Sequence, residues 1–341
     1  MQTRNSPGVA VGQQLLASRR SPAIAALLLV ALLAIFVLSL TWGSVPISAD
    51  RLWLALIGQG SASDRIILWQ LRLPRAVTGA TVGAALGISG SVLQGILRNS
   101  LANPYLLGIS AGAGLVAVAM VALGSLQPWI PLGAWIGAIL TATLVWGLAR
   151  RPDGVAVERL VLAGVAVSSL FGAIQTVLLL LSDDGRIQQA LNWIVGSLNG
   201  RGWAELQIAA PYMLVAAIAA CWLARYLNVL ALGDEMATGL GVSLERSRFL
   251  LVGSATLLAA SAVSIAGLIG FVGLIVPHGV RLLLKSGDYR AVVPLSALGG
   301  ALVLMLADWV SRLGAVELPV GAVTALLGSP AFIALLYRRS L

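Results

Sequence analysis

The side chains that most often do chemistry in proteins are scarce in this sequence. It contains one histidine, His278, one cysteine, Cys221, and one lysine, Lys285. A single histidine and a single cysteine, distant in sequence, cannot build the usual soft-ligand metal sites, and no disulfide can form within the chain. The phosphate-binding sequence G-x-x-x-x-G-K-[S/T] is absent, because Lys285 follows Leu284. We therefore expect no ATP hydrolysis by this chain, no cofactor and no site for bare metal ions.

Other catalytic and ion-coupled mechanisms find little support. A membrane protease would need paired intramembrane aspartates, or a serine with a histidine inside the bilayer, whereas His278 lies near a predicted helix end and is expected to be structural or interfacial. Ion-coupled carriers usually place acidic residues at the bilayer midplane. Here the acidic residues lie in loops, and the nearest to a membrane position, Asp308, is expected to pair with Arg312 four residues on. A secondary carrier, a membrane-embedded enzyme and a structural assembly are the alternatives to a permease driven by a separate ATPase.

The composition indicates an all-α membrane protein. Of 341 residues, 59% are hydrophobic and 10% are charged, whereas soluble domains carry about 25% charged residues. The apolar residues form unbroken blocks and not the short alternating runs of a membrane barrel. The net charge of +9 could suggest a nucleic-acid partner. However, the arginines lie at the ends of apolar blocks, which is typical of positive-inside topology, so no nucleic acid is expected.

The apolar blocks predict ten transmembrane helices, because a crossing needs about 20 apolar residues. Block 99–149 is too long for one helix and is interrupted by Gly124, Pro128 and Pro131. Block 249–280 has basic residues at both ends, which places both ends in the cytoplasm and makes the block cross twice. The predicted spans are 23–40, 76–97, two in 99–149, 160–182, 206–224, two in 249–280, 291–307 and 318–337.

This topology places both termini in the cytoplasm. Residues 1–22 are expected to form a cytoplasmic segment, and residues 23–338 the transmembrane domain. The first apolar block is longer than the core of a usual signal peptide, so a retained first helix is expected. Of the 22 Lys and Arg residues, 15 then lie inside and seven outside. Gly79, Gly83 and Gly87, spaced four apart, predict close helix packing in the second span.

Several segments carry a resemblance to a known family. They are 71–75 (LRLPR), 86–112 (LGISGSVLQGILRNSLANPYLLGISAG), 230–241 (LALGDEMATGLG), 266–281 (AGLIGFVGLIVPHGVR) and 307–330 (ADWVSRLGAVELPVGAVTALLGSP). Together they resemble the FecCD permeases of ABC importers for iron-siderophores, haem and cobalamin. The sequence departs from the family at Ser100, where an Asn-Pro-Leu-Ala motif usually has proline.

The resemblance implies the assembly and the cargo. It implies ten helices in each of two permease subunits, two cytoplasmic ATPase subunits, one periplasmic binding protein and a location in a bacterial inner membrane. We expect a homodimer, with a heterodimer of sister permeases as the alternative. Ferric siderophore is the expected cargo, and haem or cobalamin are the alternatives.

The resemblance also implies three functional regions. Arg72, Arg75 and Arg312 match arginines that meet glutamates of the binding protein, and the alternative is contact with lipid headgroups. A cytoplasmic segment at about 228–246 is expected to form short helices that seat in the ATPase, the alternative being an ordinary polar loop. Its expected coupling residues are Leu232, Gly233, Asp234, Glu235, Met236, Ala237, Leu240 and Gly241.

The third region is a gate near the cytoplasmic mouth. The family places the turn between the second and third spans there, so Asn99 and Leu101 are expected to narrow the pathway at the dimer axis. The fifth span is expected to line the pathway. Its small and polar candidates are Ser168, Ser169, Gln175 and Thr176, for which hydrogen bonding between helices is the alternative.

Overall fold

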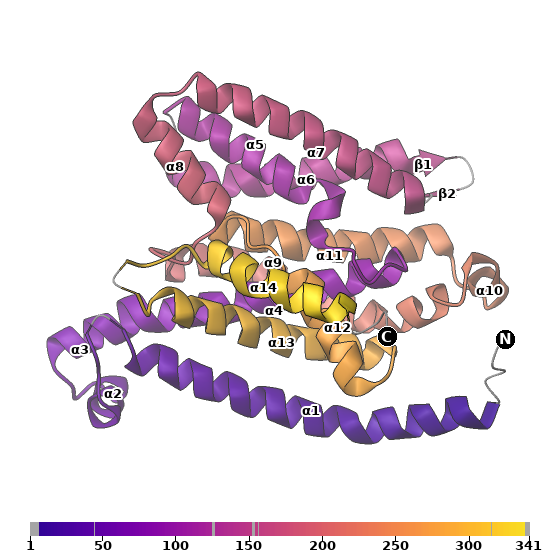
Figure 1. The fold of residues 1–341 in the computed structure, drawn as a ribbon, viewed down its shortest axis with the longest axis horizontal. Helices are drawn as coiled ribbons and strands as arrows, with labels where there is room; N and C mark the ends of the chain where they lie inside the picture. The colour runs from indigo at the N-terminus through magenta and orange to yellow at the C-terminus, as the bar shows by residue number, and fades with distance from the viewer. Residues whose placement is uncertain are drawn as a thin grey trace.

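The protein is a body of packed helices (Figure 1), which confirms the predicted all-α class. The computed structural model describes residues 7–43, 45–124, 127–151, 154–155, 157–314 and 316–337. The one sheet among these residues is a hairpin of two short antiparallel strands. The elements are α1 (Pro7–Thr41), α2 (Ala49–Leu56), α3 (Ala62–Ile66), η1 (Ile67–Arg72), α4 (Leu73–Ile96), η2 (Pro104–Leu107), α5 (Ile109–Ala122), η3 (Gln127–Trp129), α6 (Ile130–Ala149), β1 (Arg150–Arg151), β2 (Gly154–Val155), α7 (Val157–Leu180), α8 (Asp184–Val195), α9 (Trp203–Leu230), α10 (Asp234–Gly239), α11 (Leu244–Ala266), α12 (Val272–Leu284), α13 (Tyr289–Ser311) and α14 (Val320–Tyr337).

Helix α4 is the centre of the body. It packs against α13, α11, α12 and α9, and most of its residues are buried. Small residues permit this approach: a Cβ atom at Gly87 would overlap the carbonyl oxygen of Ser296, and one at Gly90 would overlap that of Gly273. The close packing predicted from the glycine spacing of the second span is therefore confirmed, since small residues let helix backbones approach.

The two ends of the body carry different elements (Figure 1). Helices α2, α3 and α8 lie at one end, and α10 and the β1–β2 hairpin lie at the other. The start of α1 and the end of α14 lie towards the α10 end. We call these the α8 end and the α10 end.

Seven of the described helices are long and apolar enough to cross a membrane, and three shorter apolar helices accompany them, namely Ile109–Ala122, Val272–Leu284 and Val320–Ala334. The predicted breaks fall where helices end: α5 stops before Gly124, and block 249–280 divides between α11 and α12. Ten crossings stay a prediction, because the three short helices have only 13–18 residues at about 1.5 Å each.

Some bounds differ from the sequence-based expectation. Helix α1 begins at Pro7, so most of the segment 1–22 is helical, and α9 continues to Leu230. The amphipathic α8 and the α2–α3 pair were not predicted, because they lack long apolar runs. Arg4, Arg338 and Arg339, which entered the charge count, lie outside the described residues.

Candidate functional site

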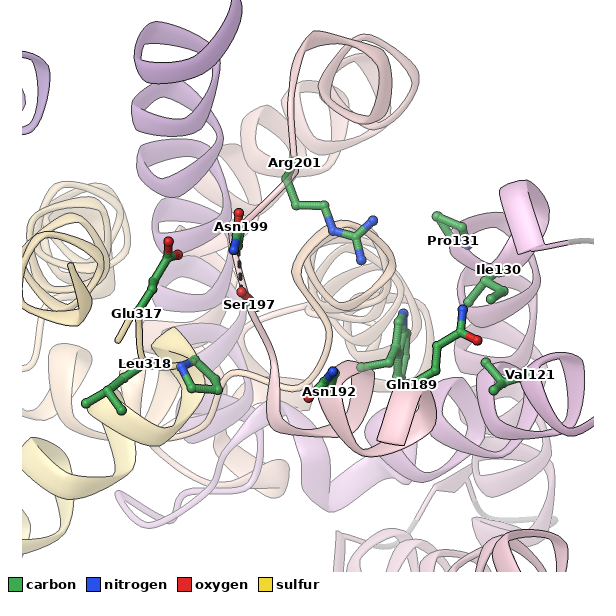
Figure 2. A pocket seen from close by; sticks show the side chains of 12 residues that line it. Val121, Ile130, Pro131, Gln189, Asn192, Ser197, Asn199, Arg201, Glu317 and Leu318 are labelled. Atoms are coloured by element: carbon green, nitrogen blue, oxygen red, sulfur yellow. Dashed lines mark hydrogen bonds between the residues drawn. The ribbon is translucent and has the colours of Figure 1, made fainter. Parts of the chain in front are cut away.

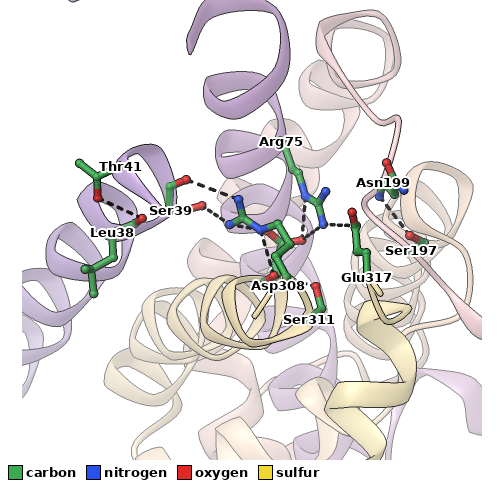
Figure 3. Close-up of polar contacts among 10 residues, drawn as sticks. Leu38, Ser39, Thr41, Arg75, Ser197, Asn199, Asp308, Ser311 and Glu317 are labelled. Carbon is green, nitrogen blue, oxygen red and sulfur yellow. Dashed lines mark hydrogen bonds and ion pairs between the residues drawn. The ribbon is translucent and has the colours of Figure 1, made fainter. Parts of the chain in front are cut away.

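Arg75, near the start of α4, lies in an ion-pair cluster at the α8 end (Figure 3). Its Nη2 and Nε atoms donate to Oδ1 of Asp308 at 2.7 and 2.9 Å, and Nη2 also donates to Oε1 of Glu317 at 2.6 Å. The Asp308 side chain is 3% exposed, whereas that of Glu317 is 32% exposed. The cluster therefore joins α4, α13 and the loop before α14 through one guanidinium group.

Arg312 and Arg72 complete this end. Arg312 Nη2 lies 3.1 Å from Oδ2 of Asp308, which confirms the expected i,i+4 pair, and it also donates to Oγ of Ser39 at 2.6 Å. Arg72 donates through Nη1 to the carbonyl oxygens of Leu40 and Thr41 at 2.6 and 3.1 Å. All three arginines thus lie at the same end of the body, each largely buried and each hydrogen-bonded to this chain.

Two cavities open beside this cluster. One, of about 540 Å³, is drawn in Figure 2 and is lined in part by Gln189 and Asn192 of α8. The other, of about 530 Å³, is lined in part by Arg72, Arg75 and Arg312. Asn199, Arg201 and Glu317 line both cavities.

Arg201 and Glu317 were not among the predicted site residues. The charge count had already placed Arg201 outside, which was the available signal, whereas nothing in the sequence linked Glu317 to Arg75. Arg201 has its nearest carboxylate, Glu205, at 3.7 Å, and its side chain is 25% exposed. An arginine with such a loose partner, beside several amide side chains, can donate hydrogen bonds to an oxygen-rich solute.

At the opposite end, the segment 228–246 contains the short helix α10. All of this segment is described, and it holds one six-residue helix where several were expected. Gly233 and Gly241 flank the helix with φ angles of 114° and 79°, which glycine adopts at little cost. Ala237 is buried against the body. One short helix with glycine boundaries is therefore present, and the prediction of more than one is wrong.

The outward side of this segment is apolar. Leu232, Met236 and Leu240 are 61%, 58% and 61% exposed, and they recur every four residues. Glu235, in the first turn of α10, also lies in solvent. Exposed apolar side chains grouped in this way are typical of a protein-binding surface.

Asp234, the first residue of α10, is held by two arginines. Both of its carboxylate oxygens accept hydrogen bonds from Arg248 Nη2 at 2.8 Å, and Oδ1 also accepts from Arg98. Burial alone would raise the pKa of Asp234, but the hydrogen bonds and charges of Arg248 and Arg98 outweigh it, so the pKa lies below its ordinary value. The carboxylate is therefore charged at neutral pH.

The expected gate turn follows Arg98 directly. Asn99 is exposed, and its Oδ1 accepts a hydrogen bond from the Leu101 amide at 2.9 Å. Leu101 is 47% exposed. Asn103 caps η2 by accepting from the amides of Tyr105 and Leu106. The turn is thus locally ordered, and Leu101 projects from it.

The four polar candidates of α7 divide into two pairs. Ser169 and Thr176 are exposed, and each donates to a carbonyl of its own helix. Gln175 is half-buried and donates to the carbonyl of Ala111 in α5 at 3.0 Å, which is the alternative of helix–helix hydrogen bonding. Ser168 is also half-buried, and it lies near Gly108 at the start of α5.

Comparison with known proteins agrees with this architecture. The model of the FecCD transport family matches residues 30–338. The chain is 39% identical over 322 residues to the hemin transport system permease protein HmuU of Yersinia pestis, covering 92% of this chain and 96% of that protein. It is 44% identical over 280 residues to the cobalamin import system permease protein BtuC of Halobacterium salinarum, covering 81% of this chain and 74% of the relative.

A solved structure shows the same fold. It is described as an inward-facing conformation of a metal-chelate type ABC transporter, with a TM-score of 0.85 and 31% sequence identity, covering 93% of this chain and 99% of that one. The helical body and the family match extend over almost the same residues. This chain is a member of the FecCD transport family.

Proposed function

We propose that this chain is the permease subunit of an ABC importer that moves a metal chelate across the inner membrane, with a ferric siderophore as cargo. The family membership carries the proposal, since relatives along most of the chain are import permeases for hemin, iron-hydroxamate and ferric enterobactin. The apolar helices and the exposed apolar face around α10 support it. Haem and cobalamin are the alternative cargoes.

The proposed assembly contains two permease chains, two ATPase subunits and one binding protein. Residues 23–338 form the membrane domain with ten crossings, residues 1–22 lie in the cytoplasm, and both termini face the cytoplasm. At the α10 end, Arg98 bonds to Asp234 of α10 and Arg150 lies in β1, while Arg225 and Arg246 lie near the end of α9 and the start of α11, the two helices that α10 connects. These basic residues suit the positive-inside rule for a cytoplasmic face. We assign the α8 end to the periplasm on the same ground.

Coupling to the ATPase is assigned to the segment 232–241. Leu232, Met236 and Leu240 offer an apolar surface of the kind that an ATPase groove can bury, and Glu235 can set its orientation. Glu235→Arg should uncouple ATP hydrolysis from uptake. If coupling survives both this change and deletion of the loop, the assignment is wrong.

Docking of the binding protein is assigned to the α8 end, at Arg72, Arg75 and Arg312. Arginine can hold a carboxylate through parallel hydrogen bonds. Their burial sets a condition for this role. At Arg75 an incoming carboxylate must share the guanidinium with Asp308 or displace the more exposed Glu317, at Arg312 it must share with Asp308, and at Arg72 it must compete with backbone carbonyls. Contact of these arginines with lipid headgroups is the alternative. It predicts that substitution of Glu317 does not change the affinity for the binding protein.

The pathway is assigned to the two-fold axis of a homodimer, a common symmetry among oligomers. Helix α7 presents Ser169 and Thr176 on an open face, and Asn99 and Leu101 close the cytoplasmic mouth. Cysteines at Asn99 or Leu101 should crosslink across the dimer when the gate is shut. Failure to crosslink in every nucleotide state, or a purified complex with two different permease chains, would count against this arrangement.

Two experiments test the proposal. If the coding neighbourhood of this chain holds an ATPase and a binding protein, as the proposal expects, their co-expression with the chain should give a complex that purifies together. Ligand binding to that binding protein should identify the chelate, and binding of ferric siderophore in preference to haem or cobalamin is expected. A chain that recruits no ATPase would refute the importer assignment.

A further inference from the structure

Asp234 lies where the coupling segment meets the rest of the α10 end. Its carboxylate is bonded by Arg248 of α11 and by Arg98, the residue that precedes the gate turn. The Arg248 side chain is 9% exposed, and its Nη1 donates to the carbonyl of Val155 in β2 at 3.2 Å. Arg248 is thus fixed to the helical body, whereas the side chains of Asp234 and Arg98 are 45% and 40% exposed.

Arg98 is fastened to the coupling segment at two points. Its Nε donates to the carbonyl of Leu230, the last residue of α9, at 2.9 Å, and its Nη2 pairs with Asp234, four residues beyond the helix end. Its own backbone is left-handed, with φ of 47°, a conformation that residues other than glycine rarely adopt. The side chain therefore spans from the end of α4 to the α9–α10 junction.

We propose that the Asp234–Arg98 pair transmits movement of α10 to the gate turn that carries Asn99 and Leu101. This inference rests on the proposed function, in which the ATPase seats on α10. Asp234 belongs to α10, the helix on which the proposed ATPase acts. Arg98 immediately precedes Asn99 in the sequence, so the pair connects α10 to the gate turn through two residues. Asp234 and Arg98 are positioning residues, and neither needs to touch cargo or nucleotide.

If the pair had a purely structural role, its loss would lower the stability of the fold. Exposed ion pairs contribute little to stability, and both of these side chains are more than a third exposed. Replacing Arg98 by glycine also suits its left-handed backbone. Loss of the pair should therefore leave the fold intact and change only the amount of substrate carried for each ATP hydrolysed.

The test uses the full complex with its ATPase and binding protein in proteoliposomes, with Asp234→Asn, Arg98→Gly and the double variant. Asp183→Asn is the control, because it removes an ion pair to Arg186 that is similarly exposed but lies at the α8 end, away from the coupling segment and the gate turn. Substrate uptake, ATP hydrolysis, ATPase retention and melting temperature are measured for each.

We expect both single variants to lower substrate carried per ATP by roughly tenfold, the usual scale of coupling between two sites. The double variant should be no worse than either single one, because both remove the same link. ATPase retention and the control should match the parent, as should the melting temperature of Arg98→Gly, whereas Asp234→Asn should melt lower because it also breaks the pair with the buried Arg248. Unchanged uptake per ATP in both single variants would overturn the proposal, as would additive losses or losses that follow ATPase release. A parent complex without ATP-dependent uptake would instead refute the proposed function, and this inference with it.

Discussion

Asp308→Asn should destabilise the protein far more than a matched change at the surface. The Asp308 carboxylate is 3% exposed, and it pairs with Arg75 at 2.7 Å and with Arg312 at 3.1 Å. Asparagine keeps the shape of the side chain but removes the negative charge. The guanidinium groups of Arg75 and Arg312, 13% and 12% exposed, would then repel each other without the negative charge of Asp308 between them.

The magnitude follows from burial. Removing one partner of a buried ion pair costs about 3–5 kcal/mol. Glu317 and Ser39 continue to accept hydrogen bonds from the two arginines, so we take the lower limit, about 3 kcal/mol. At about 2–4 °C per kcal/mol, the melting temperature of the purified protein should fall by about 6–12 °C. Both proteins must be heated at the same rate, because unfolding of large proteins is often irreversible.

Asp183→Asn is the control. Asp183 pairs with Arg186 at 3.1 Å, but the two side chains are 62% and 44% exposed. Asp183 also caps α8 by accepting from the Arg186 amide, and asparagine caps helices as well as aspartate does. The control should therefore melt within about 4 °C of the parent, since a surface pair contributes about 0–1 kcal/mol. Equal melting temperatures for the two variants would refute the assignment of Asp308 as a buried anchor.

Three further predictions concern packing, pH and docking. Gly90→Ala should lower the free energy of unfolding by about 1–3 kcal/mol, because the new Cβ would overlap a backbone carbonyl of α12. The control Gly253→Ala, with no atom within 4 Å of its Cβ, should not lower it. Equal melting temperatures for the two variants would contradict the packing of α4. The depressed pKa of Asp234 means that its ion pairs are complete above its ordinary value of 3.8 and are lost as pH falls through the lower folded value. The hydrogen-exchange protection factors of α10, which are corrected for the intrinsic pH dependence of exchange, should therefore stay unchanged from pH 7 to pH 4, and lower protection at pH 5 would contradict the pairing. Glu317→Gln should strengthen association with the binding protein, because it frees Arg75 for an incoming carboxylate. Added salt should weaken this association. If neither change alters the association, the lipid-headgroup alternative is favoured.

The sequence identified the long apolar helices because their signal is local. Gly124, Pro128 and Pro131 mark the break between α5 and α6, and the basic residues flanking 249–280 led to the division that produces α11 and α12. Helix α8 was missed because its polar and apolar residues are mixed, so it gives no charge-free block. The extension of α9 to Leu230 was missed for the same reason, because helix ends that carry polar residues resemble loops in sequence.

The candidate site was predictable only in part. The i,i+4 pair of Asp308 and Arg312 follows from helix geometry alone. The pairing of Arg75 with Asp308 joins residues 233 positions apart, and that of Arg98 with Asp234 joins residues 136 apart, so tertiary packing decides both. The sequence pointed to the relevant arginines, but it could not reveal that they are buried against this chain's own carboxylates and carbonyls.

Whether ATP or an ion gradient drives uptake decides if this chain is the permease of an ATP-driven importer. The purified complex of this chain, its ATPase and its binding protein is reconstituted in proteoliposomes, and uptake of the ferric chelate is measured with ATP alone and with an ion gradient alone. Uptake should require ATP and the binding protein, and it should continue after ionophores collapse every gradient. Uptake that an ion gradient drives without ATP would contradict it and would identify the chain as a secondary carrier.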